Sequence, residues 1–460
     1  MKKKEPIKKI NTQEVKNGSL LKLTMGILSV VAFVIGHIYG VSLFLYAGVF
    51  LMVANFVLFP DDLLCFELLY LPLVNILKLS PTGASLLSYI SLVGVAVFLL
   101  KRKSVNIDIS TIFVAVALFV LILFKGLFQG FSFSMAYVRL VITMAVTAIY
   151  VKTKVDDSKM SEKDINQTNV FLSCGVILSS VIGFVFVENV NLSRFLTSDA
   201  QYVGGKLVSR FSGVSADPNY FSALVIFAIA ANLFCFIQRP HFLNIVFAVV
   251  LAIFGLLSLS KMFLILLIVI LILFLFSWIK EKGFSNSKNI TVLIVLILGL
   301  CLGMHFILNS DSVQLILMRM DDSANINDFT TNRSDTWIKY AKALWDDFNF
   351  FFIGVDNNDA IVGRHVTHNT FIQIWWKLGL VGIGLVLTWF VLVWNKCKKK
   401  NISGTLMMFV GCLGAAIAID LLFFEQFFWF FAFFVICRQA AYNKEIKSCI
   451  SGLVPEDKSR

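Results

Sequence analysis

Long apolar segments alternate with short polar segments along most of the chain. A helix that crosses a hydrocarbon core about 30 Å thick needs about 20 apolar residues, and it satisfies its own backbone hydrogen bonds without water. The pattern therefore predicts an all-α polytopic membrane protein with about 12–14 transmembrane helices. The fourteen predicted spans are 23–39, 41–59, 63–79, 84–100, 107–124, 134–151, 169–187, 219–237, 241–257, 260–279, 290–308, 370–394, 403–419 and 421–437.

Two long polar loops interrupt this pattern, at 188–218 and 309–369. The chain is therefore expected to comprise a tail (1–22), a transmembrane bundle that includes the smaller loop (23–308), the large loop (309–369), further transmembrane helices (370–437) and a final tail (438–460). The weakest span is 63–79, which contains Glu67, Pro72 and Lys78. The segment 403–437 fits two spans, one broken helix or a re-entrant pair.

The large loop contains its own helical pattern. A helix is predicted to begin at Asn332 or Ser334, because either residue is a suitable N-cap. Apolar side chains then recur at helical spacing, with charged residues on the other faces, which is typical of an amphipathic helix on a membrane surface. These apolar residues are Trp337, Tyr340, Leu344, Trp345 and Phe348.

Composition and charge agree with a membrane protein and suggest its orientation. The chain is 58% hydrophobic and 15% charged, whereas soluble domains are roughly 25% charged. With both termini inside, the predicted cytoplasmic segments hold 27 of the 40 Lys and Arg residues, as the positive-inside rule requires. The net charge of +12 therefore indicates the orientation of a membrane protein, and it does not indicate nucleic-acid binding. Both long loops are then extracytoplasmic, and the expected location is the cytoplasmic (inner) membrane.

The sequence gives no indication of a cofactor. It has neither a P-loop nor a G-x-G-x-x-G motif. The eight cysteines form no C-x-x-C pair and avoid both long loops, which argues against a zinc site and a disulfide framework. His365 and His368 are three residues apart, but no nearby carboxylate pattern completes a metal site. We therefore expect no metal and no cofactor.

Charged residues at the outer ends of the predicted spans are the candidates for chemistry. Arg210 and Arg333 carry guanidinium forks suited to phosphate, and His368 titrates near neutrality and can accept a proton. Lys78 and Arg139 lie in or beside spans on the same side, where charges often line a cavity. An outward cavity with these four cations would suit a diphosphate. The structural alternatives are snorkelling or solvated cations and a hydrogen-bonded interface histidine.

Several short motifs occur in order over roughly residues 200–390. They are Arg210-x-x-Gly213-x-x-x-Asp217-Pro218-Asn219, Ser260-Lys261, Asn332-Arg333, Gly354, His368-Asn369 and Gly379-x-x-Gly382. Together these motifs resemble the O-antigen ligase and polysaccharide polymerase superfamily. The family's Ser-Arg-Gly reads Ser260-Lys261-Met262 here, so no catalytic role is carried over to it.

The resemblance implies a metal-independent, inverting glycosyltransferase that uses undecaprenyl-diphosphate-linked glycans outside the membrane. By motif, Arg210 and Arg333 would bind the diphosphate and His368 would activate the acceptor hydroxyl. We favour a polymerase of capsular or exopolysaccharide repeats over an O-antigen-type ligase. The rival from another class is a lipid-linked oligosaccharide flippase. A chain-length regulator and a flippase are the expected protein partners. The further substrate-binding candidates are Lys78, Arg139, Asn219, Asn369 and Asp420.

Overall fold

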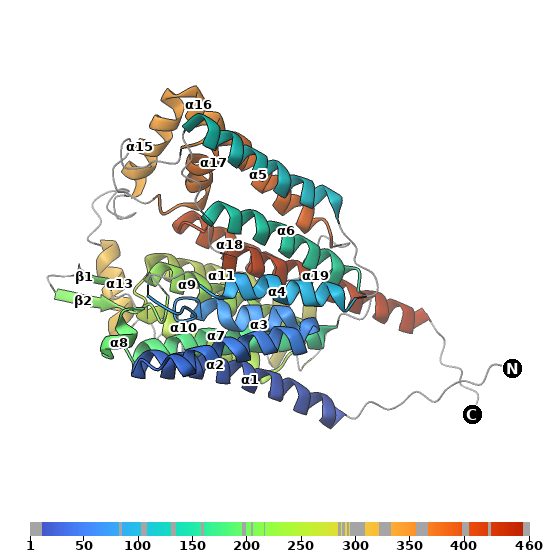
Figure 1. Ribbon diagram of the computed structural model, residues 1–460. Helices are drawn as coiled ribbons and strands as arrows, with labels where there is room; N and C mark the ends of the chain where they lie inside the picture. Colours follow the sequence, from blue (N-terminus) through green and yellow to red (C-terminus); the bar gives the residue numbers. More distant parts are fainter. Residues whose placement is uncertain are drawn as a thin grey trace, which may run out of the picture.

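The computed structural model shows a bundle of helices with a small hairpin at one end (Figure 1). The helical fold class that the sequence predicts is confirmed. The structure describes residues 12–81, 85–102, 108–129, 135–157, 161–195, 199–203, 206–215, 217–283, 287, 290–291, 294, 309–321, 333–355, 367–397, 404–421 and 425–453. Its helices are α1 (Thr12–Tyr39), α2 (Ser42–Leu58), η1 (Pro60–Asp62), α3 (Leu63–Tyr70), η2 (Leu71–Leu73), α4 (Leu87–Leu100), α5 (Ile109–Gln129), α6 (Met135–Val155), α7 (Glu162–Val185), α8 (Val190–Ser193), α9 (Pro218–Gln238), α10 (Phe242–Leu257), α11 (Lys261–Lys282), α13 (Asp311–Asp321), α15 (Arg333–Asp346), α16 (Phe348–Ile353), α17 (Thr370–Trp394), α18 (Thr405–Ala418) and α19 (Glu425–Leu453).

Seven of the described helices are long and apolar enough to cross a membrane: Gly18–Tyr39 of α1, then α5, α6, α7, α9, α11 and α17. The bent pair Ser42–Leu58 and Pro60–Leu73 raises this number to eight if it is one span. These helices support a multi-pass membrane protein. The larger count of about 12–14 stays a prediction, and the predicted span 290–308 lies almost entirely outside the described residues.

The two ends of the bundle differ in chemistry. At the end that we call the basic end, Lys396 after α17 pairs with Asp108 before α5, and Lys444 of α19 donates to the Gln238 carbonyl at the end of α9. The opposite end, the site end, carries α8, α13, α15 and the hairpin (Figure 1). The cations that define the basic end are Lys22, Lys101, Arg102, Lys154, Lys396 and Lys444.

Two doubtful parts of the predicted topology take specific forms. The chain bends by 100° between Ser42–Leu58 and Pro60–Leu73, and the predicted span 63–79 is a short helix followed by turns. Proline at positions 60 and 72 explains this, because proline removes a backbone donor and interrupts a continuing helix. At 403–437, α18 and α19 are separate helices that pack on each other.

The smaller polar loop contains a hairpin that we did not predict. Strands β1 (Asp199–Val203) and β2 (Lys206–Arg210) pair antiparallel, with Asp199 opposite Arg210 and Val203 opposite Lys206. The sequence signal was Gly204-Gly205 between two short segments, a pair typical of two-residue hairpin turns. The hairpin delivers Arg210 directly to the site end of the bundle.

The amphipathic helix of the large loop differs from its prediction in extent and in packing. Helix α15 ends at Asp346, and Phe348 belongs to α16, whose N-cap is Asp347. Tyr340 and Leu344 are buried, and the Tyr340 ring meets the ring of Trp376 in α17 at 4.7 Å between centroids. The sequence pattern thus identified a real helix, but its buried face packs on α17. Exposed aromatic residues such as Trp345 remain on its other side.

Helix α17 breaks at Gly379, which has φ +66° and ψ −173°. Gly354, with φ +78°, lies against this break, and a side chain at either glycine would collide with the other segment's backbone. Lys125 of α5, to which the sequence assigned no role, donates to the carbonyl of Lys377 at 2.6 Å. Gln129 donates to the carbonyl of Gly354 at 2.6 Å. The close contact between Gly354 and Gly379, together with these two hydrogen bonds, sets the direction of the first half of α17.

Candidate functional site

Four helices, α9, α11, α15 and α17, begin close together at the site end. Asp217 caps α9 by accepting the amide of Asn219 at 2.7 Å, and Pro218 occupies the first helical position. Ser260 caps α11 and donates to Oδ1 of Asn219 at 3.2 Å. Asn369 caps α17, because its side chain accepts the amides of Phe371 and Ile372. Helix N-termini carry partial positive charge, so their convergence favours an anion.

Arg210 is held in this group by the turn between α10 and α11. Its Nε donates to the carbonyl of Ser258 at 3.1 Å, and its Nη2 donates to Oδ1 of Asn219 at 3.1 Å. The side chain is only 5% exposed. Arg210 therefore joins the end of the hairpin to the starts of α9 and α11, and its fork is positioned before any ligand arrives.

The carboxylate of Asp420, between α18 and α19, holds the segment before α17. Its Oδ1 accepts the Asn369 amide at 2.8 Å and, in a short hydrogen bond, the Thr367 hydroxyl. Its Oδ2 accepts the His368 amide at 3.0 Å. The residue is 3% exposed. Tyr220 of α9 donates its hydroxyl to the Asp420 carbonyl at 2.9 Å, so three separated parts of the chain meet there.

Two residues of this region adopt a left-handed backbone conformation, which is rare for residues other than glycine. His368 has φ +47°, and Leu259, between Ser258 and Ser260, has φ +50°. They are the non-glycine residues with positive φ among the described residues. Such conformations cost about 1–3 kcal/mol each, persist only when their surroundings fix them, and cluster at functional sites. Here the carboxylate of Asp420 fixes the turn at His368.

Electrostatic interactions place Arg333 and His368 in the same group. Burial lowers the pKa of Arg333; among its neighbours, Asp217 raises it and Arg210 lowers it. Burial and the positive charge of Arg333 also lower the pKa of His368 from its usual 6.5, while Asp420 raises it. A lowered pKa keeps the imidazole neutral at physiological pH, which is the form that accepts a proton.

The structure therefore brings together the three residues predicted to be catalytic, Arg210, Arg333 and His368. Lys78 and Arg139 lie close enough for their positive charges to repel each other. Arg139 lines a small cavity of about 60 Å³ with residues of α4, α6 and α19. Among the described residues, no hydrogen bond or ion pair joins Lys78 or Arg139 to Asp420 or to the residues that Asp420 holds.

Three predicted substrate-binding residues already hold the chain itself. Asn219, Asn369 and Asp420 accept hydrogen bonds from side chains or amides of the site end. Sequence reasoning missed Ser258, and it named Ser260 only as part of the Ser260-Lys261 motif, without a role at the site. Their signal was the Ser-rich end of α10, but nothing in the sequence indicated that a distant arginine would bind there. Arg364 and His365 lie outside the described residues.

An apolar cavity of about 120 Å³ lies beside the site. Tyr220, Ser215 and Leu421 line it together with apolar residues of α9, α18 and α19. Within the described part of the chain, no cluster of three or more His, Cys, Asp or Glu residues could hold a metal ion. The site is thus a cationic group with a neutral imidazole at the end of a helical bundle, next to an apolar space.

Neither the protein-family models nor the curated proteins give a match to this chain. What the structure defines is a class, a polytopic all-helical membrane protein whose polar site joins both long loops to helix ends.

Proposed function

We propose that the protein is a membrane glycosyltransferase that joins undecaprenyl-diphosphate-linked oligosaccharide repeats into a polysaccharide. The observation that supports it best is the convergence of Arg210, Arg333 and His368 from three distant parts of the chain. Two guanidinium groups beside helix N-termini suit a diphosphate. The neighbouring apolar cavity suits part of an isoprenoid chain.

In the proposed reaction, an acceptor sugar hydroxyl attacks the anomeric carbon of the donor from the face opposite the diphosphate. The new glycosidic C–O bond forms as the bond to the diphosphate oxygen breaks, so the configuration inverts. His368 takes the hydroxyl proton, and the departing diphosphate carries the electron pair and its developing charge towards Arg210 and Arg333. No metal or nucleotide takes part in these steps.

The test uses purified protein and lipid-diphosphate-linked repeats without added metal or nucleotide. Loss of a general base typically slows a reaction about 10²–10⁴-fold, so we expect His368→Gln to block chain extension. Arg333→Gln and Arg210→Gln should also abolish the polymer, and Lys at position 210 should rescue only partly, because an ammonium group lacks the planar fork. Normal extension by His368→Gln would refute the assignment.

A flippase remains the candidate from another class, because the basic end carries a charged cavity opposite the site. Cells with His368→Gln distinguish the two. A polymerase variant should leave single lipid-linked repeats at the outer leaflet, whereas a flippase variant should trap them inside. A ligase shares the same chemistry; it would transfer the glycan to an acceptor other than a second lipid-linked repeat.

A further inference from the structure

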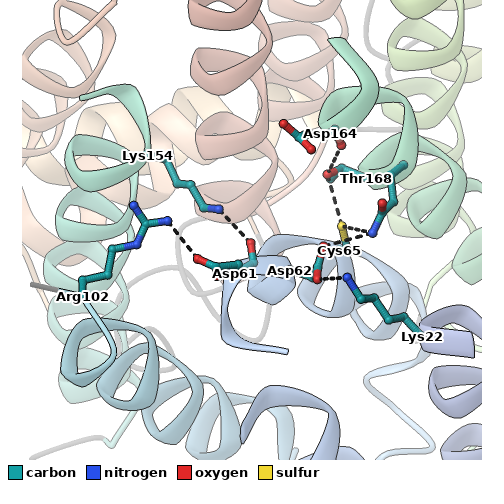
Figure 2. Close-up of polar contacts among 9 residues, drawn as sticks. Lys22, Asp61, Asp62, Cys65, Arg102, Lys154, Asp164 and Thr168 are labelled. Carbon is teal, nitrogen blue, oxygen red and sulfur yellow. Dashed lines mark hydrogen bonds and ion pairs between the residues drawn. The ribbon is translucent and has the colours of Figure 1, made fainter. Parts of the chain in front are cut away.

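A second polar cavity, of about 480 Å³, lies at the basic end of the bundle. Its wall is formed by η1 and the start of α3, the ends of α4 and α6, and the start of α7 (Figure 2). These are the ends of membrane-spanning or apolar helices, so the cavity lies where lipid headgroups meet such a bundle. The proposed glycosyl transfer at the site end does not use it.

Ion pairs fix part of this wall. Arg102 binds Oδ1 of Asp61 at 2.9 Å through Nη2 and Oδ2 of Asp157 at 3.1 Å through Nη1. Lys22 pairs with Asp62 at 2.5 Å. Arg102 is therefore shared by Asp61 and Asp157, and Lys22 pairs with Asp62, so these three carboxylates have two cations among them. Figure 2 shows Arg102 and Lys22 approaching η1 from different sides.

Two other cations of the cavity contact neutral groups. Lys101 donates to the carbonyl of Val57 at 2.9 Å, and Lys154 donates to the main-chain carbonyl of Asp61 at 2.7 Å. Among the described residues, no carboxylate lies within ion-pair distance of either ammonium group. Each ammonium has three donors, so both lysines retain the capacity to bind an anionic oxygen.

One carboxylate of the same cavity, that of Asp164, is available for a cationic group. Asp164 lines the cavity, and its Oδ2 accepts the amide and the hydroxyl of Ser161 at 2.9 Å each, in the capping box of α7. Within the described chain it has no cation at ion-pair distance. The four acidic side chains of the wall are balanced by Lys101, Arg102, Lys154 and, through Asp62, Lys22, so the cavity as a whole does not select a pure anion.

The inner wall is apolar and aromatic. Leu64, Phe98, Tyr150 and Ile436 line it, and the Lys154 ammonium lies over the rings of Phe98 and Tyr150, 5.5 and 5.9 Å from their centroids. A ligand with both charged and apolar parts fits this combination, whereas a free phosphate would leave the apolar wall uncovered.

We infer that this cavity binds the headgroup of a zwitterionic phospholipid, with the phosphodiester at Lys101 and Lys154, the amine at Asp164, and the first acyl carbons against the apolar wall. Phosphatidylethanolamine has this chemistry. The inference stands independently of the reaction at the site end.

The test is native mass spectrometry of the full-length protein, released from vesicles of equal phosphatidylethanolamine and phosphatidylglycerol. We expect the wild type to retain phosphatidylethanolamine preferentially, and Lys101→Gln with Lys154→Gln to lower that retention at least tenfold. Lys152→Gln is the matched control, because Lys152 lies on the same helix and pairs with Asp156. Asp164→Asn keeps a side-chain oxygen that can still accept the amide of the N-cap residue Ser161, and it should remove the preference for the amine-bearing lipid.

A filling variant keeps the test decisive if the double variant does not fold. Ile165→Trp places a large ring at the cavity wall and leaves every charge in place, so it should also expel the lipid. Wild-type retention in Ile165→Trp and in whichever lysine variant folds would overturn the site, and equal retention of both lipids by the wild type would overturn the zwitterion. Displacement of the lipid by soluble phosphoethanolamine at equal concentration would show a soluble ligand instead.

Discussion

The turn at His368 offers the sharpest test of how the site is built, through Asp420→Asn. The carboxylate accepts three hydrogen bonds, and two of them come from the amides of His368 and Asn369. An asparagine of the same shape loses the charge and turns one acceptor into a donor. Hydrogen bonds to charged groups contribute about 1.5–3 kcal/mol and neutral ones about 0.5–1.5 kcal/mol. One lost and two weakened bonds should therefore cost about 3.5–6 kcal/mol locally.

At about 1.4 kcal/mol per factor of ten, that cost should raise the exchange rate of the His368 and Asn369 amides by roughly 300- to 20,000-fold. Hydrogen exchange measured on peptides that span 367–371 reports this without any activity assay. Turnover should fall together with the population of the correct turn, and the fall should be no larger than the gain in exchange.

The matched control is Asp347→Asn, which makes the same chemical change at the N-cap of α16. Asp347 also accepts two amides, those of Asn349 and Phe350, but Asn is an equally good cap. In Asp347→Asn, the exchange rate of the 367–371 amides and the turnover should stay close to those of the wild type. Unchanged protection of the 367–371 amides in Asp420→Asn would refute the view that this carboxylate maintains the turn.

Three further predictions use other parts of the structure. Because the pKa of His368 lies below 6.5 in the folded protein, turnover should persist below pH 6.5, and in Arg333→Gln the imidazole should titrate at higher pH, as followed by NMR of its ring protons without an activity assay. The lowered pKa also means that the imidazole of His368 binds a proton more readily in the unfolded chain than in the folded protein. The free energy of unfolding should therefore fall as pH falls from 6.5 through the folded pKa, and His368→Asn should reduce this fall in thermal unfolding measurements. Lys125→Met removes the 2.6 Å hydrogen bond to the Lys377 carbonyl, which keeps the Tyr137 hydroxyl at 3.5 Å, and it should cost about 1–3 kcal/mol, seen as a lower midpoint of unfolding. Lys342→Met at an exposed position of α15 should not lower the midpoint; equal midpoints would argue against the role of Lys125 at the break in α17. If the basic end is cytoplasmic, Asn349→Cys should react with an impermeant thiol reagent in intact cells and Arg239→Cys only after permeabilisation; the reverse pattern would invert the orientation.

The sequence predicted those features that depend on local composition. Apolar runs predicted the helices because a membrane span needs length and hydropathy alone. Arg210, Arg333 and His368 could be grouped because each lies beside a polar loop or a span end on the same predicted side. The helix of the large loop was also visible, although its periodicity could not show that Tyr340 and Leu344 would pack on Trp376.

Features that depend on contacts between distant segments were not accessible in this way. The carbonyl of Ser258 binds Arg210 across 48 residues, and Asp420 binds the amide of His368 across 52. Neither partner carries a local signal, because a carbonyl exists at every residue and a single aspartate near a helix end is equally compatible with solvent.

The two ends of the bundle show how one helical scaffold supports different polar chemistry. At the site end, Asn219, Asn369 and Asp420 hold other parts of the protein, and Arg210 is itself held by Ser258 and Asn219. The proposed substrate contacts are assigned to the arginines and His368 because of their chemistry, a guanidinium fork for phosphate and an imidazole for a proton. A strained turn held by a buried carboxylate is costly, and a merely structural loop would not need it. This is the physical reason to assign the chemistry to the residues that the turn positions, and Asp420 to their support.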